Sequence, residues 1–407
     1  MSRGYGVEAL AWKEVSIGGI DCPKRRLEMV MGFGSGLAQR PGDPPDRVWA
    51  VGDRGPNLKV EVAVEMYGLT TLAQHAESDG VKLMPRLDVG PTLAELQVGA
   101  DRVALVRMLS LRDASGAPLT GLPPPGTSTA KLEPVVDLHG APIPPDPSGA
   151  DTEGLVALPD GGFVVGDEYG PSLLLLDAEA RVTARWVPQG CAAAFAGAAY
   201  PIVEALPAIA VHRRLNRGFE ALTLSADGTQ LILAFQSPLA LPDKRTSQRA
   251  RHVRLWVLDV ATGALDAEYL YPLNLPAAFR RDERAEQGDV KVSEIVALAD
   301  GSLLVLERVS QSTKFYRVRL DAPLAPEWRD PARTPSLEAL SAAGESLPAL
   351  NKTLVLDTDD APEIGADLEG MAVLSPRELL LVNDNDFGCE GAVTGFWRVT
   401  FDTPVLG

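Results

Sequence analysis

The feature of this sequence that most constrains its fold is a motif that recurs along the chain. Each copy has a glutamate at the start of an apolar run, then a tight turn, then a second apolar run that ends in polar residues. Four copies carry the glutamate, at Glu153, Glu220, Glu294 and Glu369, and a weaker copy near the N-terminus has Ser35 in its place. Such repetition predicts a repeat architecture built from one supersecondary unit.

Each copy has the pattern of a β-hairpin followed by further strands. Asp160-Gly161, Asp227-Gly228 and Asp300-Gly301 separate pairs of apolar runs, and Asp-Gly in that position is a strong hairpin signal. Two more strands are expected after each hairpin, at residues 92–98 and 103–111, 173–176 and 182–187, 255–260 and 268–271, and 315–320 and 353–356. About four strands per copy is typical of a β-propeller blade.

We therefore expect an all-β chain that forms one β-propeller of four-stranded blades over residues 1–407. Five blades carry the motif, and a sixth without it would fit between Ser35 and Glu153. Residues 114–149, rich in proline and glycine, are interpreted as a linker or loop insertion. The last copy has only three strands before the chain ends, so a strand around residues 7–15 is expected to supply the fourth and close the ring.

Composition excludes several classes of function. The formal net charge of −17 argues against nucleic acid as a partner. No apolar stretch reaches the roughly 18 residues of a membrane-spanning helix, so no membrane insertion is expected. No signal peptide is visible at the N-terminus, which predicts a cytoplasmic protein, or a periplasmic or secreted one if a signal has been removed. The three cysteines and four histidines have no zinc-site spacing, so any metal would have oxygen ligands, as calcium or magnesium has.

The repeat also predicts where the polar residues meet. In a blade, the start of the first strand and the end of the antiparallel second strand lie on the same face, so both sets should surround one mouth of the channel. The strand-start set, predicted to hold a metal, is Glu153, Glu220, Glu294 and Glu369. The strand-end set, predicted to be catalytic, is Asp53, Arg54, Asp167, Glu168, Glu307, Arg308 and Asp384.

Charge repulsion suggests what such a mouth would bind. Like charges crowded on one rim repel unless protons, arginines or a cation neutralise them. Arg54 and Arg308 offset two of the charges, and a divalent cation, calcium first and magnesium second, is the expected partner of the rest. In a hydrolase the two arginines would clamp an anionic substrate oxygen, while Asp167, Glu168 or Asp384 would be the general base.

The chain resembles the phytase-like family, described as "esterase-like activity of phytase". The segments that carry the resemblance are Gly34-Ser35-Gly36-Leu37, Gly52-Asp53-Arg54-Gly55-Pro56-Asn57, Asp113 through Leu119-Thr120-Gly121-Leu122-Pro123, Asp151-Thr152-Glu153-Gly154-Leu155, Asp167-Glu168-Tyr169-Gly170-Pro171, Asn216-Arg217-Gly218-Phe219-Glu220 and Asp367-Leu368-Glu369-Gly370. The resemblance implies a propeller and a hydrolase whose substrate is a small-molecule ester or phosphoester.

Two other functions fit the same residues. The Glu-Gly-Leu start of the strand at Glu153 is also similar to gluconolactonase-like propellers, in which such a glutamate binds a divalent metal that polarises a lactone carbonyl. The third function is a non-catalytic propeller that binds a ligand or serves as a scaffold.

Overall fold

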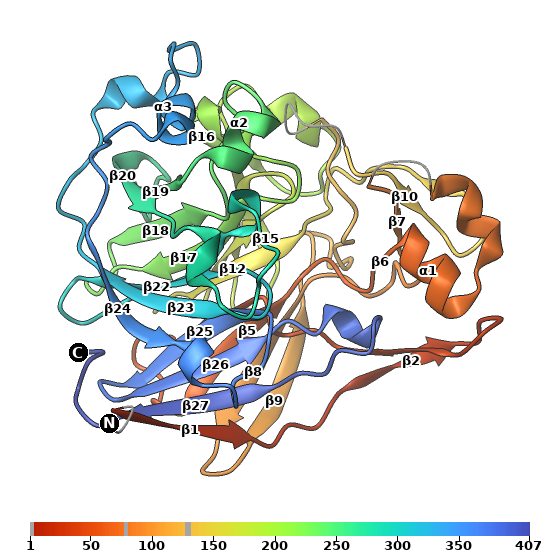
Figure 1. The fold of residues 1–407 in the computed structure, drawn as a ribbon. Helices are drawn as coiled ribbons and strands as arrows, with labels where there is room; N and C mark the ends of the chain where they lie inside the picture. The colour runs from red at the N-terminus through yellow and green to blue at the C-terminus, as the bar shows by residue number, and fades with distance from the viewer. Residues whose placement is uncertain (1–3, 77–79, 127–131) are drawn as a thin grey trace.

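The computed structural model describes residues 4–76, 80–126 and 132–407, and most of its regular structure is β-strand (Figure 1). None of the helices within these ranges is long and apolar enough to cross a membrane. The α-helices in these ranges are α1 (Val60–Tyr67), α2 (Lys244–Arg249) and α3 (Leu337–Ala343), and α2 contacts α3. Short 3-10 helices lie in the connections, at Thr70–His75, Ala192–Phe195, Ala208–His212, Pro276–Ala278, Gln287–Asp289, Pro326–Arg329, Thr358–Asp360 and Asp386–Gly388.

Five of the sheets in the described ranges each contain one copy of the motif. In order of pairing, their strands are β4 (Gly36–Ala38), β5 (Arg47–Gly52), β8 (Thr92–Val98) and β9 (Val103–Ser110); β12 (Thr152–Ala157), β13 (Phe163–Asp167), β14 (Ser172–Leu176), β15 (Val182–Pro188) and β16 (Ile202–Leu206); β17 (Phe219–Leu224), β18 (Gln230–Phe235), β19 (His252–Asp259) and β20 (Leu265–Pro272); β21 (Lys291–Ala297), β22 (Leu303–Arg308), β23 (Thr313–Val318) and β24 (Lys352–Asp357); and β25 (Leu368–Ser375), β26 (Glu378–Asn383), β27 (Phe396–Phe401) and β1 (Tyr5–Leu10).

The Asp-Gly turns form the hairpins that the sequence predicts. At the turn between β21 and β22, Gly301 has a φ of 79°, a conformation that glycine adopts without strain. The preceding Asp300 accepts a hydrogen bond from the Ser302 backbone N–H at 3.0 Å, which holds the turn. The second strands are buried along their whole length, as in β13, or at all but their first residue, as in β18, because neighbouring sheets cover both faces.

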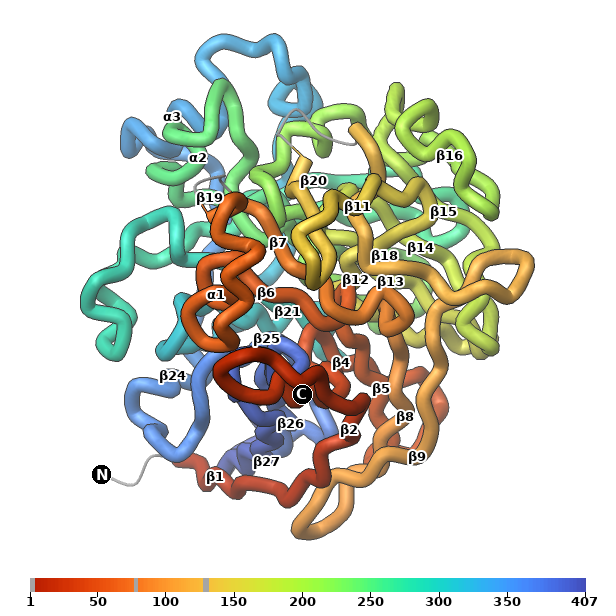
Figure 2. Tube along the Cα trace, turned by 90° about the vertical axis from the view of Figure 1, so that its right-hand side faces the viewer, coloured from red at the N-terminus to blue at the C-terminus, as the bar shows by residue number. Residues whose placement is uncertain are grey.

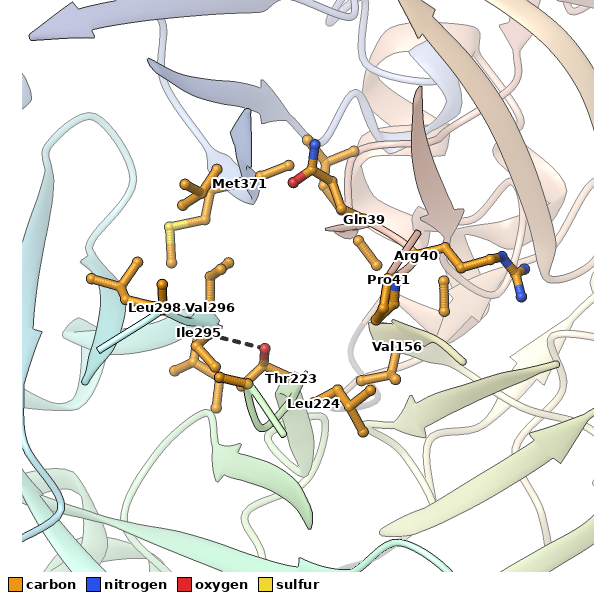
Figure 3. A pocket seen from close by; sticks show the side chains of 18 of the residues that line it. Gln39, Arg40, Pro41, Val156, Thr223, Leu224, Ile295, Val296, Leu298 and Met371 are labelled. Carbon is orange, nitrogen blue, oxygen red and sulfur yellow. Dashed lines mark hydrogen bonds between the residues drawn. The ribbon is translucent and has the colours of Figure 1, made fainter. Parts of the chain in front are cut away.

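The first strands of the five sheets lie next to one another. β12 contacts β4 and β17, β21 contacts β17 and β25, and β25 contacts β4. Their later residues surround a cavity of about 460 Å³, with Val156, Thr223, Ile295 and Met371 around it (Figure 3). The starts of the same strands, which carry the motif glutamates, therefore lie away from this cavity, at the end of the strands that we call the mouth.

The N-terminal strand joins the last sheet. β1 pairs antiparallel with β27, with Val7 opposite Val399, so the chain ends meet in one sheet as the sequence predicts (Figure 1). Leu10, at the end of β1, is 5% exposed and belongs to a hydrophobic cluster that includes Leu96 and Phe396. The strand is thus held both by its ladder and by the core.

The segment between β5 and β12 contains regular structure of its own. A small sheet has the order β11 (Pro142–Ile143), β10 (Val135–Val136), β7 (Lys82–Leu83) and β6 (Leu58–Lys59). Outside this segment, before β4, a separate hairpin pairs β2 (Ser16–Ile20) with β3 (Leu27–Val30). Residues 114–149, interpreted from the sequence as a linker or loop insertion, contain β10 and β11, and β10 pairs with β7, which precedes β8. Residues 127–131 of this segment lie outside the described ranges. Together with α1 the small sheet stands on one side of the five sheets (Figures 1 and 2).

Truncating the side chain of Leu10 tests whether the N-terminal strand is an integral part of the core. Leu10→Ala should reduce the free energy of unfolding by about 2–5 kcal/mol, because it leaves a cavity in a packed cluster. Chemical denaturation measures this, with Ala9→Ser, an exposed site on the same strand, as the control that should change stability by less than about 0.5 kcal/mol. Equal stability of Leu10→Ala and wild type would mean that β1 is not packed as described.

Candidate functional site

A β-bulge at the start of the first strand sets apart the motif residue in three of the copies. In β17, Phe219 lies opposite Phe235 but Ala221 lies opposite Ala234, so Glu220 is the extra residue. The same shift occurs in β12 around Glu153 and in β25 at Glu369. A bulge takes one residue out of the ladder and redirects its side chain, so one backbone device presents all three glutamates.

The fourth copy differs by one residue. In β21, Val292 lies opposite Glu307 and Glu294 lies opposite Leu306, so the bulged residue is Ser293. Glu294 therefore occupies the next position, and its carboxylate accepts hydrogen bonds from Ile295 N–H at 2.9 Å and from Leu37 N–H at 3.3 Å. Burial raises the pKa of Glu294 well above its usual value. Glu294 thus differs from the other three glutamates, because it is not the bulged residue and its carboxylate is bound by the backbone of β4.

Two of the predicted catalytic carboxylates turn into the sheets instead of the mouth. Asp167 is fully buried, forms an ion pair with Arg185, and accepts hydrogen bonds from Tyr169 N–H at 2.9 Å and Gly170 N–H at 3.0 Å. Asp167 comes directly before Glu168, a residue of the mouth, and successive side chains in a strand point in opposite directions.

Glu307 is the second of these carboxylates. It accepts hydrogen bonds from Tyr271 Oη at 2.6 Å, Asn274 N–H at 2.7 Å and Lys352 Nζ at 2.5 Å. Its oxygens, like those of Asp167, are thus occupied by groups of the fold, and neither residue is part of the site.

Three carboxylates from neighbouring sheets do come together. Asp53, Asp151 and Glu153 each offer an oxygen, and these oxygens lie within 4.8 Å of one another. Oδ1 of Asp151 and Oε2 of Glu153 are buried without a hydrogen-bond partner among the described residues, and Oδ2 of Asp151 forms an ion pair with Arg54 at 2.5 Å. Of the three, sequence reasoning assigned a role to Asp53 and Glu153 but not to Asp151.

Further acids line the same mouth. Glu168 is 3% exposed, and Glu220, 1% exposed, accepts a hydrogen bond from Ser293 Oγ at 3.0 Å while its other oxygen has no partner in the described ranges. Asp384 is half-buried and accepts a hydrogen bond from Asp386 N–H at 3.2 Å. Glu369 pairs with Arg308, so its charge is already balanced.

Crowding and burial perturb these acids strongly. Burial, then the charges of Asp384 and Asp151, raise the pKa of Asp53 well above its usual value. Burial, then Glu220 and Glu168, do the same to the pKa of Glu153. Burial raises the pKa of Asp151 to about 6, and burial with the charge of Asp386 raises that of Asp384 to about 7. In the absence of a cation, this mouth therefore holds protons near neutral pH.

The two arginines predicted to clamp a substrate are bound to the protein itself. Arg54 donates to Glu133 and to Asn216 Oδ1, the latter at 2.5 Å, in addition to its ion pair with Asp151. Arg308 donates to Ser293 Oγ at 3.0 Å, to Asp367 Oδ1 at 3.0 Å and to Glu369. Both act on neighbouring carboxylates, which leaves few of their N–H groups for a ligand.

The trio Asp53, Asp151 and Glu153 can be compared with the equivalent residues around Arg308. The strand registers place Arg308, Asp367 and Glu369 at the repeat positions that Asp53, Asp151 and Glu153 occupy three repeats earlier along the chain. At one junction a guanidinium lies between two carboxylates, and at the other a third carboxylate stands in its place. Arg54 pairs with Asp151 alone among the three, so Asp53 and Glu153 have no ion-pair partner in the described residues, and this arrangement fits a hard divalent cation.

Two cations of the mouth were not found by sequence reasoning. Lys291 lies opposite Arg308 at the start of β21, and burial, with the charges of Arg308 and Arg217, lowers its pKa to about 7. Burial also lowers the pKa of Arg217, which precedes β17. The mouth therefore has an acidic part around Asp151 and a basic part around Lys291.

Comparison with known proteins gives one family. The family model described as "Phytase-like: Esterase-like activity of phytase" matches residues 29–387. A curated relative, "Uncharacterized secreted protein" of Arthroderma benhamiae, is 27% identical over 315 residues, which is 69% of this chain. The chain spans 59% of that relative's length.

Similar solved structures are distant. A luciferin-regenerating enzyme has a TM-score of 0.37 and 11% identity, covering 97% of this chain and 95% of its own. The β-propeller domain of Myceliophteria thermophila Cps50 (Swd1) has a TM-score of 0.31 and 12% identity, covering 91% of this chain and 82% of its own.

Removing the Asp384 carboxyl should change how stability depends on pH. Its pKa is raised from 3.8 to about 7 on folding, so the folded state retains a proton that the unfolded state loses. The contribution is full below about pH 4 and is lost as the pH rises toward 7. In chelator, wild type should lose stability across this window, and Asp384→Asn should lose less.

Denaturant titrations at pH 4, 5, 6 and 7 measure these slopes. Glu61→Gln, an exposed change in α1, should follow the wild-type slope. Parallel slopes for wild type and Asp384→Asn would show that Asp384 does not retain its proton in the fold.

Proposed function

The chain belongs to the phytase-like family, and on that premise we propose that it is a metal-dependent hydrolase of ester or phosphoester substrates that acts at the acidic mouth of its central channel. The architecture that we propose for this site is a propeller of five blades, one for each motif-bearing sheet, closed by the pairing of β1 with β27. The contacts of the first strands around one cavity support this arrangement.

The observation that carries the proposal is the trio Asp53, Asp151 and Glu153. One oxygen of each residue lies within 4.8 Å of the other two, and Asp151 and Glu153, which are buried, have oxygens without hydrogen-bond partners in the described structure. Desolvated carboxylates without partners are costly unless a cation binds them. Calcium is the cation that we propose, since it accepts carboxylate ligands in flexible geometry, and magnesium is the alternative.

The chemistry of the site follows from its charges. A divalent cation, when bound, polarises an ester or phosphoryl oxygen and makes bound water more acidic. Asp384, whose pKa is about 7, is suited to accept and return a proton near neutral pH. Glu168 faces the charges of Glu220 and Asp151 and is the second proton acceptor that we propose. Arg54 orients Asp151 through their ion pair.

We also propose that the protein acts outside the cytoplasm. The curated relative is named as a secreted protein, which favours the second of the two compartments expected from the sequence and does not support the cytoplasmic one.

Metal-linked stability, measured together with turnover, tests the proposed function. Calcium should raise the melting temperature of chelator-treated wild type, since a cation at one hundred times its Kd stabilises the folded state by about 2.7 kcal/mol. Asp151→Asn and Glu153→Gln should each abolish most of this rise. Glu369→Gln is the matched control: it stands at the same repeat position but is paired with Arg308, so it should lower the baseline and keep the calcium-dependent rise.

The same proteins are then assayed on p-nitrophenyl phosphate, p-nitrophenyl acetate and a lactone. Phosphoester or ester turnover that requires metal, and that falls at least a hundredfold in Glu153→Gln, supports the hydrolase. Turnover of the lactone alone would select the lactonase. A wild type with neither metal response nor turnover would contradict the proposal and leave a binding propeller.

A further inference from the structure

A pocket with an excess of cations opens beside the acidic mouth. Its volume is about 580 Å³, and it is lined by Arg217, residues 280–285, Asp289, Lys291 and residues 309–310. Five of the lining side chains are arginine or lysine and three are aspartate or glutamate. In a chain with a net charge of −17, such a local reversal of charge needs a reason.

Several of the charged side chains that line this pocket form hydrogen bonds or ion pairs with other residues of the protein. Arg280 pairs with Asp360 at 2.6 Å, and Arg281 donates to Thr358 Oγ1 at 2.7 Å. Among the acids, Asp282 accepts from the Ser312 N–H at 2.7 Å and Asp289 accepts from the Glu286 N–H at 2.8 Å. These groups stabilise the wall of the pocket.

Three cations remain with few partners. Arg217 donates to Ser237 Oγ at 3.2 Å, and Lys291 has an ionic contact with Glu369 at 3.9 Å. Arg284 is exposed and forms no hydrogen bond or ion pair with the part of the chain that the structure describes. The three side chains come from three separate segments and line one pocket, an arrangement typical of an anion site.

The repeat shows how Lys291, which lines this pocket, is related to the acids of the mouth. Lys291 occupies the strand position that holds Asp151 and Asp367 in two other copies, opposite Arg308 as Asp151 is opposite Glu168. The charges of Glu168 and Glu220 act on both Lys291 and Arg217. Lys291, which lines the pocket, also lies 3.9 Å from the Glu369 carboxylate, so the basic pocket borders the acidic mouth.

We infer that Arg217, Arg284 and Lys291 bind an oxyanionic group of the substrate, a phosphate or a carboxylate, that is separate from the bond cleaved at the carboxylate trio. This inference rests on the proposed function only in assigning the anion to a substrate. Binding of the anion itself requires neither metal nor turnover. The substrate class that follows is an ester or phosphoester with a second, remote negative charge.

Calorimetric titration of the full chain with inorganic phosphate and, separately, with acetate tests the inference. Chelator-treated protein at low ionic strength is used, so that a metal cannot supply the binding. Phosphate or acetate should bind, more weakly as sodium chloride is added. Arg217→Gln and Arg284→Gln should each weaken binding about tenfold, the loss expected when a charge-assisted hydrogen bond worth about 1.4 kcal/mol is removed.

Three controls keep the result interpretable. Lys291→Arg keeps the charge and should bind within about threefold of wild type, whereas Lys291→Gln should not. Glu153→Gln removes a carboxylate of the trio and should keep anion binding. Arg181→Gln, an exposed arginine away from the pocket, should bind as wild type does.

Preference for phosphate over acetate, or the reverse, would identify the group, and either supports the inference. Absence of binding by both anions, or binding that the Arg217 and Arg284 variants leave unchanged in folded protein, would overturn it. Anion binding that appears only with calcium and disappears in Glu153→Gln would also overturn it, while supporting the metal centre.

Discussion

The crowding of carboxylates in a mouth shielded from water is the constraint on which the rest of this site depends. Burial and mutual repulsion disfavour every negative charge there, so each must be met by a proton, an arginine, a lysine or a metal. Arg308 meets Glu369, and Arg54 meets Asp151 only in part. What is left unbalanced, at Asp53 and Glu153, explains both the raised pKa values and the affinity for a cation that we propose.

The repeat allows the charges of the mouth to be compared from one sheet to the next. One bulge, placed at the start of the first strand, presents a side chain to the mouth in several sheets, and the strand registers make the sheets comparable position by position. Differences between equivalent positions then carry the chemistry. Arg308 stands where Asp53 stands in another sheet, and Lys291 stands where Asp151 does. Because cationic residues replace acids at these equivalent positions, the mouth has an acidic and a basic part.

Sequence reasoning reached the strands because their signals are local. Alternating apolar runs and Asp-Gly turns predicted the hairpins, and the missing fourth strand of the last copy predicted the pairing of β1 with β27. It failed where the outcome depends on a register shift of one residue. Aligning Glu294 with the other glutamates was natural, but the bulge falls on Ser293, and nothing in the local pattern marks which residue leaves the ladder.

The adjacent acids at strand ends raised the same difficulty. Asp167 turns inward because Arg185, two strands away, pairs with it, and such a partner is not visible before the sheet is built. Asp151 did have a signal: Asp151-Thr152-Glu153 and Asp367-Leu368-Glu369 share the spacing Asp-x-Glu. In the second of these pairs both acids contact Arg308, and in the first we propose that both bind the metal. Repeated pairs of acids are therefore better guides to such a site than single glutamates.

The most direct test of this account is the stoichiometry of calcium bound to purified wild type and to Asp53→Arg, measured by equilibrium dialysis and elemental analysis. The substitution rebuilds at the trio the arrangement that Arg308 makes with Asp367 and Glu369. The account predicts one calcium ion per wild-type chain, none in folded Asp53→Arg, and a melting temperature of the metal-free variant above that of metal-free wild type. Equal calcium content in the two proteins, or none in wild type, would contradict it.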